Sequence, residues 1–103
     1  MTYQELKELL EATGIRFAFH HWDRPPKMPY GVYFDDHNDN FAADGAVYST
    51  ARHFLVELYE RQRDEELEGR LEAVLDGVGL YWEKSSTYID SERFWQISYE
   101  IEV

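Results

Sequence analysis

The chain is 103 residues long, 44% hydrophobic and 17% aromatic, and its 21 acidic and 10 basic residues give a formal net charge of −11. This composition argues against disorder, and the excess of acid argues against binding to a phosphate backbone, which needs clustered lysine and arginine. With no cysteine, disulfides and thiolate metal sites are excluded. No apolar run reaches the roughly 18 residues of a membrane helix, and no signal-peptide pattern opens the chain. We therefore expect one soluble, cytoplasmic domain over residues 1–103.

A helix is predicted at the start of the chain. Thr2 and Glu5 have the spacing of a capping box, in which each side chain bonds the backbone amide of the other. Gly14 supplies the left-handed residue that commonly ends a helix. The apolar residues at helical spacing between them are Leu6, Leu9 and Leu10.

Two strands joined by a proline-rich connection are predicted next. Arg16–Trp22 indicates a strand whose side chains alternate between two faces. The three prolines of Asp23–Pro29 forbid a helix and remove backbone donors, so this segment is expected to be a surface connection. Tyr30–Phe34 is predicted to resume as a strand.

The longest predicted strand, Ala46–Arg61, follows the turn signal Asp44-Gly45. Before the turn, Asp35–Asn40 is predicted to be a polar loop and Phe41–Ala43 a short arm. The second half of the long strand is rich in aromatic and β-branched residues, which suits a half-buried pleated surface. One face is predicted to carry Phe54, Val56 and Leu58, and the other Leu55, Glu57 and Tyr59.

A second helix is predicted from Asp64, a good N-cap residue that is followed by Glu65 and Glu66 near the positive end of the helix dipole. Gly79 is expected to end this helix. The predicted buried stripe is Leu67, Leu71, Val74, Leu75 and Val78.

Two strands are predicted to close the chain. Leu80–Lys84 is the first, and Ser85–Arg93 is predicted to be a loop or hairpin connection. Phe94–Val103 has the clearest period-two pattern in the sequence, which requires one dry face and one wet or partner-facing face. The apolar positions of that pattern are Trp95, Ile97, Tyr99, Ile101 and Val103, and they alternate with Gln96, Ser98, Glu100 and Glu102.

A helix, a glycine and a strand follow one another twice, with Leu6 of the first unit and Leu71 of the second 65 residues apart. Two helices that each lead into a strand are expected to pack on the same face of one sheet. The predicted fold is therefore α+β, a mostly antiparallel sheet with two helices on one face, in the order α-β-β-(β)-β-α-β-β.

The four histidines are not predicted to form a metal site. His20 and His21 are adjacent on a predicted strand, so they should point to opposite faces. A site made of His21, His53 and a loop aspartate stays open, but no motif spacing calls for one. The acidic loop after Asp35 fails as a calcium loop because Phe41 occupies the position that needs glycine.

No catalytic residue, cofactor or metal is predicted, and the chain is not expected to be an enzyme. Glu57, Glu100 and Glu102 are candidates to line one sheet face, where two of them could do acid-base work. The serines have no nucleophile elbow, and the six glycines are scattered singly and form no phosphate loop.

The 17 aromatic residues exceed what a small core readily encloses, and tyrosine and tryptophan are enriched where proteins meet. The alternative is that most of them cap the core edge with the hydroxyl in water. The residues predicted to lie at an interface are Tyr33, Phe41, Tyr48, Tyr59 and Tyr88.

Three stretches of sequence carry a resemblance to a known family. They are His20–Asp36 (HHWDRPPKMPYGVYFDD), Asn40–Tyr48 leading into His53–Tyr59, and the closing Phe94–Val103. In the sequence of these stretches and in its element order, the chain resembles the tail-completion, or tail-terminator, proteins encoded by long-tailed phages and prophages of Gram-positive bacteria. The resemblance covers nearly the whole chain and includes no short diagnostic motif.

The resemblance implies a non-enzymatic structural protein that caps the tail tube and joins it to the head. Such proteins form hexameric rings, so the implied partners are other copies, the tail tube and the head-completion proteins, with no sequence-specific nucleic-acid or membrane binding. The implied location is the host cytoplasm during assembly and then the head-proximal end of the tail.

The acidic balance then has a specific interpretation. Glu57, Glu100 and Glu102 are expected to face the lumen of the ring, where like charge keeps passing DNA from sticking. A plain solvated acidic surface is the alternative interpretation of the charge. Two other functions stay open: a monomeric acidic interaction module, such as an inhibitor or DNA mimic that binds a basic partner, and a small metal-dependent enzyme.

Overall fold

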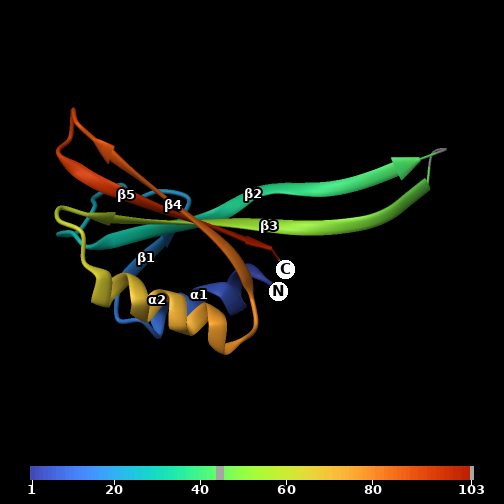
Figure 1. The fold of residues 1–103 in the computed structure, drawn as a ribbon, viewed down its shortest axis with the longest axis horizontal. Helices are drawn as coiled ribbons and strands as arrows, with labels where there is room; N and C mark the ends of the chain where they lie inside the picture. Colours follow the sequence, from blue (N-terminus) through green and yellow to red (C-terminus); the bar gives the residue numbers. More distant parts are fainter. Residues whose placement is uncertain (44–45, 103) are drawn as a thin grey trace.

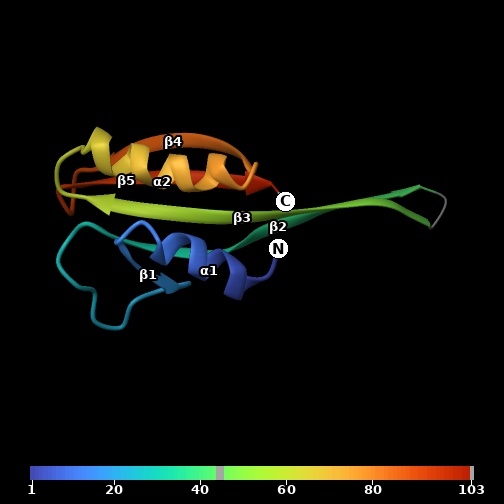
Figure 2. The ribbon, with the colours of Figure 1, turned by 90° about the horizontal axis from the view of Figure 1, so that it is seen from below.

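The computed structural model of the chain describes residues 1–43 and 46–102, and the side chains of 1–35 and 53–102. One five-stranded sheet, in the order β1-β2-β3-β5-β4, carries two helices on one face (Figures 1 and 2). Among the described strands, β1 and β2 pair in parallel and the other neighbouring pairs are antiparallel. The predicted α+β class and the two-helix face are confirmed. The elements are α1 (Tyr3–Glu11), β1 (Arg16–Phe19), β2 (Tyr30–Ala43), β3 (Ala46–Glu60), α2 (Glu65–Gly77), β4 (Tyr81–Ile89) and β5 (Phe94–Glu102).

Helix α1 begins as its capping box predicts. The Glu5 amide donates to Thr2 Oγ1 at 3.1 Å, and the Thr2 amide donates to Glu5 Oε1 at 3.2 Å. Leu6 and Leu10, on the inward face of this helix, are fully buried. Gly14 follows with φ +81°, the left-handed conformation that ends the helix.

Strand β1 is shorter than predicted, because it ends at Phe19 and not at Trp22. His20 has φ +67°, which turns the chain out of the strand into the proline-rich connection. The ring of Phe17 lies over Gly31 of β2, where a Cβ would come within 2.3 Å of it. Glycine at this position therefore permits the close approach of β1 and β2.

The polar loop predicted at Asp35–Asn40 is wrong, because β2 runs without a break from Tyr30 to Ala43. Aspartate and asparagine have low strand propensity. Pairing with β3 supplies the backbone hydrogen bonds that override this preference, with register shifts between Asp35 and His37 and between Phe41 and Ala42. The predicted short arm is thus the end of β2, and the Asp44-Gly45 turn lies outside the described residues.

Beyond the body of the sheet, β2 and β3 continue as a two-stranded ribbon that we call the arm, residues 37–43 and 46–52. Among the strands described, β1 pairs with β2 as far as Tyr33, and β5 pairs with β3 only from His53 onward. Figure 1 shows the arm projecting past every other element. The molecule measures 49 × 31 × 24 Å as a result.

The core lies between the sheet and the two helices. Phe54, Val56 and Leu58 of β3 are fully buried and share the face predicted for them. The alternation of β5 is confirmed too, and Val103 lies outside the described residues. The other fully buried residues of this core are Leu6, Leu10, Leu71, Leu75, Ile97, Tyr99 and Ile101.

Helix α2 begins at its predicted cap, where Asp64 accepts a hydrogen bond from the Leu67 amide at 3.1 Å. The prediction that Val78 belongs to the buried stripe of this helix is wrong, because Val78 follows the last helical residue and is 50% exposed. Gly79, with φ +74°, then turns the chain toward β4. No helix in the described ranges is long and apolar enough to cross a membrane.

Strand β4 extends to Ile89, so the loop predicted from Ser85 is largely strand. The reason is again cross-strand pairing, which runs in register from Tyr81 with Glu102 to Ile89 with Phe94. Arg93, with φ +58°, completes the tight connection between the two strands.

Candidate functional site

The face of the sheet away from the helices carries a group of carboxylates. Because Val56 and Leu58 point into the core, Glu57 between them points to the opposite face. Cross-strand pairing adds three neighbours on β5 and β4, since Leu55 pairs with Glu100 and Glu100 with Glu83. We call this set the acidic face: Glu57, Glu83, Glu100 and Glu102. The structure therefore brings together the three glutamates singled out in the sequence and adds Glu83.

One histidine belongs to the acidic face. His53 Nδ1 lies 3.3 Å from Glu100 Oε1, and the Glu100 side chain is 41% exposed. His53 also lines a small recess of about 70 Å³ with Tyr81, Glu83 and Glu102. His53 itself is buried, so the partly exposed Glu100 carboxylate is the member of this pair that a partner can reach.

Tyr59, a predicted interface residue, lies in an aromatic row that crosses the same open face. Its hydroxyl donates to Glu57 Oε2 at 2.5 Å, and burial together with Glu57 raises the pKa of the Tyr59 phenol. Ring centroids are 6.1 Å apart for Trp22 and Tyr30, 5.3 Å for Tyr30 and Tyr59, and 5.5 Å for Tyr59 and Phe94. The rings of this row are half-buried and lie beside the acidic face.

The other predicted interface residues have different positions. Tyr88 is 42% exposed at the far end of β4. Tyr33 is only 5% exposed and belongs to the core, so it does not form part of the surface. Phe41 and Tyr48 lie on the arm, outside the residues whose side chains are described.

Two exposed aromatic residues were missed by sequence reasoning. Phe19 is 49% exposed and Tyr81 is 61% exposed, and each lies on one of the two outermost strands. These two residues are exposed because β1 and β4 are the outermost strands, so each has a neighbouring strand on one side only. The sequence around both residues is typical of a buried strand. No sequence signal marked them, because Phe19 lies in the middle of the strand predicted at Arg16–Trp22 and Tyr81 lies within the strand predicted at Leu80–Lys84.

A second group of charges lies on the opposite, helix-covered side. Glu68 of α2 is 1% exposed and accepts two hydrogen bonds from Arg63, at 3.0 and 2.9 Å. Lys84 Nζ of β4 lies 2.8 Å from Glu68 Oε1 and 2.7 Å from Glu72 Oε2. Tyr99 of β5 donates to the same Glu72 oxygen at 2.7 Å. This buried ion cluster ties α2 to β4 and β5.

Glu60, at the end of β3, is the uncompensated member of the cluster. It is 2% exposed, its oxygens accept no hydrogen bond of ordinary geometry from the described residues, and Arg63 Nε is 4.0 Å from Oε1. Burial and the neighbouring Glu68 raise the pKa of Glu60 to about 8. Burial alone would also raise the pKa of Glu68, but hydrogen bonds from Arg63, Glu60 and Lys84 lower it to about 2.

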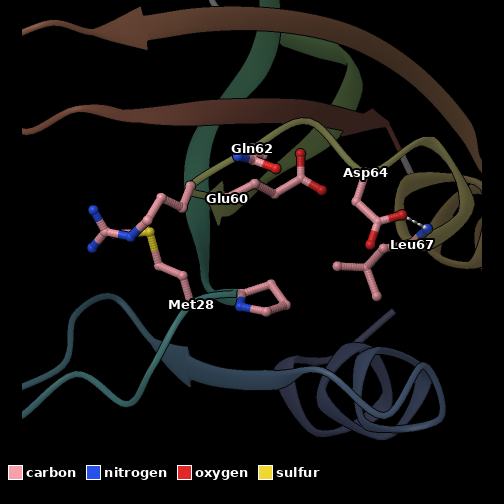
Figure 3. A pocket seen from close by; sticks show the side chains of 7 residues that line it. Met28, Glu60, Gln62, Asp64 and Leu67 are labelled. Carbon is pink, nitrogen blue, oxygen red and sulfur yellow. Dashed lines mark hydrogen bonds between the residues drawn. The ribbon is translucent and has the colours of Figure 1, made fainter.

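A pocket of about 240 Å³ opens next to Glu60, between the proline-rich connection, the end of β3 and the start of α2 (Figure 3). Met28, Pro29 and Leu67 supply apolar walls. Of its acidic groups, Asp64 is engaged in capping α2, as the dashed line in Figure 3 marks, and Glu60 is buried in the ion cluster. Both carboxyl groups therefore have structural roles.

The histidines differ from the prediction in one respect. His20 and His21 do not point to opposite faces, because the positive φ of His20 ends the strand alternation. Their Nδ1 atoms lie 3.1 Å apart instead. Within the described part of the chain, no three histidine or acidic side chains are grouped so as to hold a metal ion.

Comparison with known proteins finds a solved structure with a similar fold. No family model matches the sequence, and no curated protein matches it. Among solved structures, a chain from the virion of a native gene transfer agent (GTA) particle superposes with a TM-score of 0.66, covering 97% of this chain and 87% of that chain. The two sequences are 13% identical, so the likeness is one of fold.

Proposed function

We propose that this protein is a structural component of a virion, and specifically the tail-completion protein that caps the tail tube and joins it to the head. The observation that carries the proposal is the fold shared, over nearly the full length of both chains, with a virion chain of a gene transfer agent. The family resemblance of the sequence adds the position within the virion. The protein would act first in the host cytoplasm and then at the head-proximal end of the tail.

The arm supports an assembly role. A two-stranded ribbon is marginally stable by itself in water, and each of its strands has an outer edge of backbone donors and acceptors suited to pairing with another chain. An element of this kind is stabilised by packing on a neighbour. In a ring, each copy offers its arm to the next copy, to the tube or to the head-completion proteins.

The acidic face supports a position along the DNA path. Strand register puts its carboxylates on the side of the sheet opposite the helices. Figure 1 shows that no helix covers that side of the sheet. If this side lines the lumen of a ring, passing DNA meets like charge and does not adhere. Glu57, Glu100 and Glu102 would then act as a set, with Glu83 beside them.

The lumen assignment is tested by reversing the three charges of Glu57, Glu100 and Glu102 to lysine. We expect particles that assemble but release DNA slowly, measured as ejection kinetics. A matched reversal of Glu65, Glu66 and Glu92, all exposed and outside the acidic face, is the control. Normal ejection by the first variant would remove the assignment.

The tail-completion role is tested by deleting the gene from its phage or prophage and measuring tails by electron microscopy. We expect tails of uncontrolled length without heads, and rescue by the intact chain. A variant with residues 37–52 replaced by a short turn keeps the buried core and should fail to rescue. Normal, headed particles after deletion would contradict the proposal.

The acidic face also favours one other function, a monomeric interaction module that binds a basic partner. Light scattering at high protein concentration separates the two functions, because only the ring predicts concentration-dependent mass. Stable capture of a purified basic protein by a strict monomer, together with normal tails after deletion, would favour the module.

A further inference from the structure

The two outermost strands each end in an exposed aromatic residue at the same end of the body. Phe19 closes β1, and Tyr81 opens β4. Phe19 pairs with Tyr33, close to the start of the arm, and Tyr81 pairs with Glu102, which itself pairs with His53 at the arm base. The arm therefore leaves the five-stranded part of the sheet between two exposed aromatic residues, with Phe19 on the β1 edge and Tyr81 on the β4 edge.

Both aromatic rings are held in place by neighbours. The Phe19 ring packs edge-on against Tyr3 and Tyr33, with centroids 4.7 and 5.7 Å apart. The Tyr81 hydroxyl donates to Glu83 at 3.0 Å. A fixed, exposed aromatic ring is a pre-organised contact that loses little entropy on binding.

The charges along these two edges have opposite sign. The β1 edge, formed by β1 and its connection to β2, carries exposed Arg16, Arg24 and Lys27 against Asp23. Between Asp76 and Arg93 the β4 edge carries two exposed cations, Arg93 and Lys84, and Lys84 is already paired with Glu68 and Glu72. The exposed acids of the β4 edge are Asp76, Glu83, Asp90 and Glu92.

We propose that the β1 edge of one copy docks on the β4 edge of the next copy, with Phe19 of the first beside Tyr81 of the second. This contact rests on the proposed ring and specifies which surfaces form it. Because the two edges are different surfaces, the contact is heterologous and repeats from copy to copy until the ring closes. Setting a basic edge against an acidic one offsets the repulsion between chains of net charge −11.

The geometry of a ring fixes the pairing further. Neighbouring copies are related by rotation about the ring axis, so their arms lie at the same end of each contact. Phe19 is therefore expected to meet Tyr81, at the arm end of β4, and not Tyr88, at the other end of the strand.

Disulfide trapping tests this pairing cleanly, because the chain has no cysteine of its own. Phe19→Cys and Tyr81→Cys are made as separate full-length variants and oxidised alone and as a mixture, both purified at high concentration and in cells that assemble the virion. We expect the mixture to form a linked dimer at least about tenfold faster than either variant alone. The double variant should give a ladder that ends at the ring.

The matched control replaces Tyr81→Cys with Tyr88→Cys, an exposed tyrosine on the same strand, and should trap only at the collision rate. Faster linking of Phe19→Cys to itself would indicate an isologous contact and overturn the proposal, as would equal trapping by Tyr88→Cys. Absence of the mixed dimer in both settings would also overturn it. Uncontrolled tails after gene deletion would then leave the tail-completion role standing, so the two failures are distinguishable.

A second measurement uses charge in place of covalent linkage. Phe19→Asp and Tyr81→Asp each spoil one edge, so each variant alone should remain monomeric by light scattering. A mixture retains one intact pair of edges and should form a heterodimer and nothing larger. Full rings from either variant alone would contradict the proposed contact.

Discussion

The two faces of the sheet both carry glutamates, yet these groups have different environments. On the helix-covered face, Glu68 is buried and held by Arg63 and Lys84. On the open face, Glu100 is partly exposed and meets one histidine. A buried carboxylate needs donors from the protein, whereas an exposed one is satisfied by water. The first group therefore fixes the fold, and the second is free to serve a partner.

The largest expected difference between the two faces of the sheet is in how much their hydrophobic side chains contribute to the free energy of unfolding. Leu58→Ala empties a fully buried site under the helices and should lower the free energy of unfolding by about 3 kcal/mol. Leu55→Ala, on the open face of the same strand, should cost about 1 kcal/mol, because that side chain is already partly in water. Urea unfolding of both variants measures the contrast, and equal losses would show that the open face is covered in solution.

The buried ion cluster gives the next effect. Glu68→Ala leaves Arg63 and Lys84 without their shared partner and should cost about 3 kcal/mol, the lower end for a broken buried pair, because both cations retain some contact with water. Glu65→Ala, one turn earlier and exposed, should cost less than about 1 kcal/mol. Similar losses from the two variants would contradict the structural role given to the cluster.

Glu60 should make stability depend on pH. Its folded pKa of about 8 lies above the unfolded value of 4.5, so the folded state binds the proton more tightly. Its stabilising contribution is complete below pH 4.5 and is lost as the pH rises through 8. Glu60→Gln keeps the shape without the titration, so it should exceed the wild type in stability by about 4 kcal/mol at pH 8 and match it near pH 4. Thermal melts across that range test this, and parallel curves would contradict it.

The smallest effect is expected on the acidic face. Glu100→Gln removes an exposed partner of His53 and should change the free energy of unfolding by less than about 0.5 kcal/mol. The same substitution is informative in assembly assays, where a change in ring formation or DNA release without loss of stability would mark the open face as functional. A large loss of stability would show that Glu100 holds the fold together.

Local signals in the sequence were sufficient for the two helices and for strands β3 and β5. The capping box at Thr2 and the cap at Asp64 depend on residues within one turn, so their chemistry is visible without the fold. The alternation of β5 was equally readable, since each apolar residue in turn meets the same core. The three glutamates expected on one face were found there because strand periodicity alone assigns a face.

The predictions that were wrong concern residues whose structure depends on contacts with distant segments of the chain. Asp35–Asn40 looks like a loop by composition, but β3 supplies a complete partner for it. Ser85 to Ile89 is strand because β5 lies alongside. Tyr33, predicted to lie at an interface, is covered by packing that includes Phe19 of the neighbouring strand. No local pattern contains this information.

The sequence by itself determined where the helices begin, which face of β3 and of β5 is apolar, and that the chain carries an excess of acidic residues. Only the tertiary structure decided which strands are outermost, how far β2 and β3 run on as an arm, and which glutamates are buried. The physical reason is range: caps and periodicity act over a few residues, whereas burial and strand pairing depend on residues that meet only after the chain has folded.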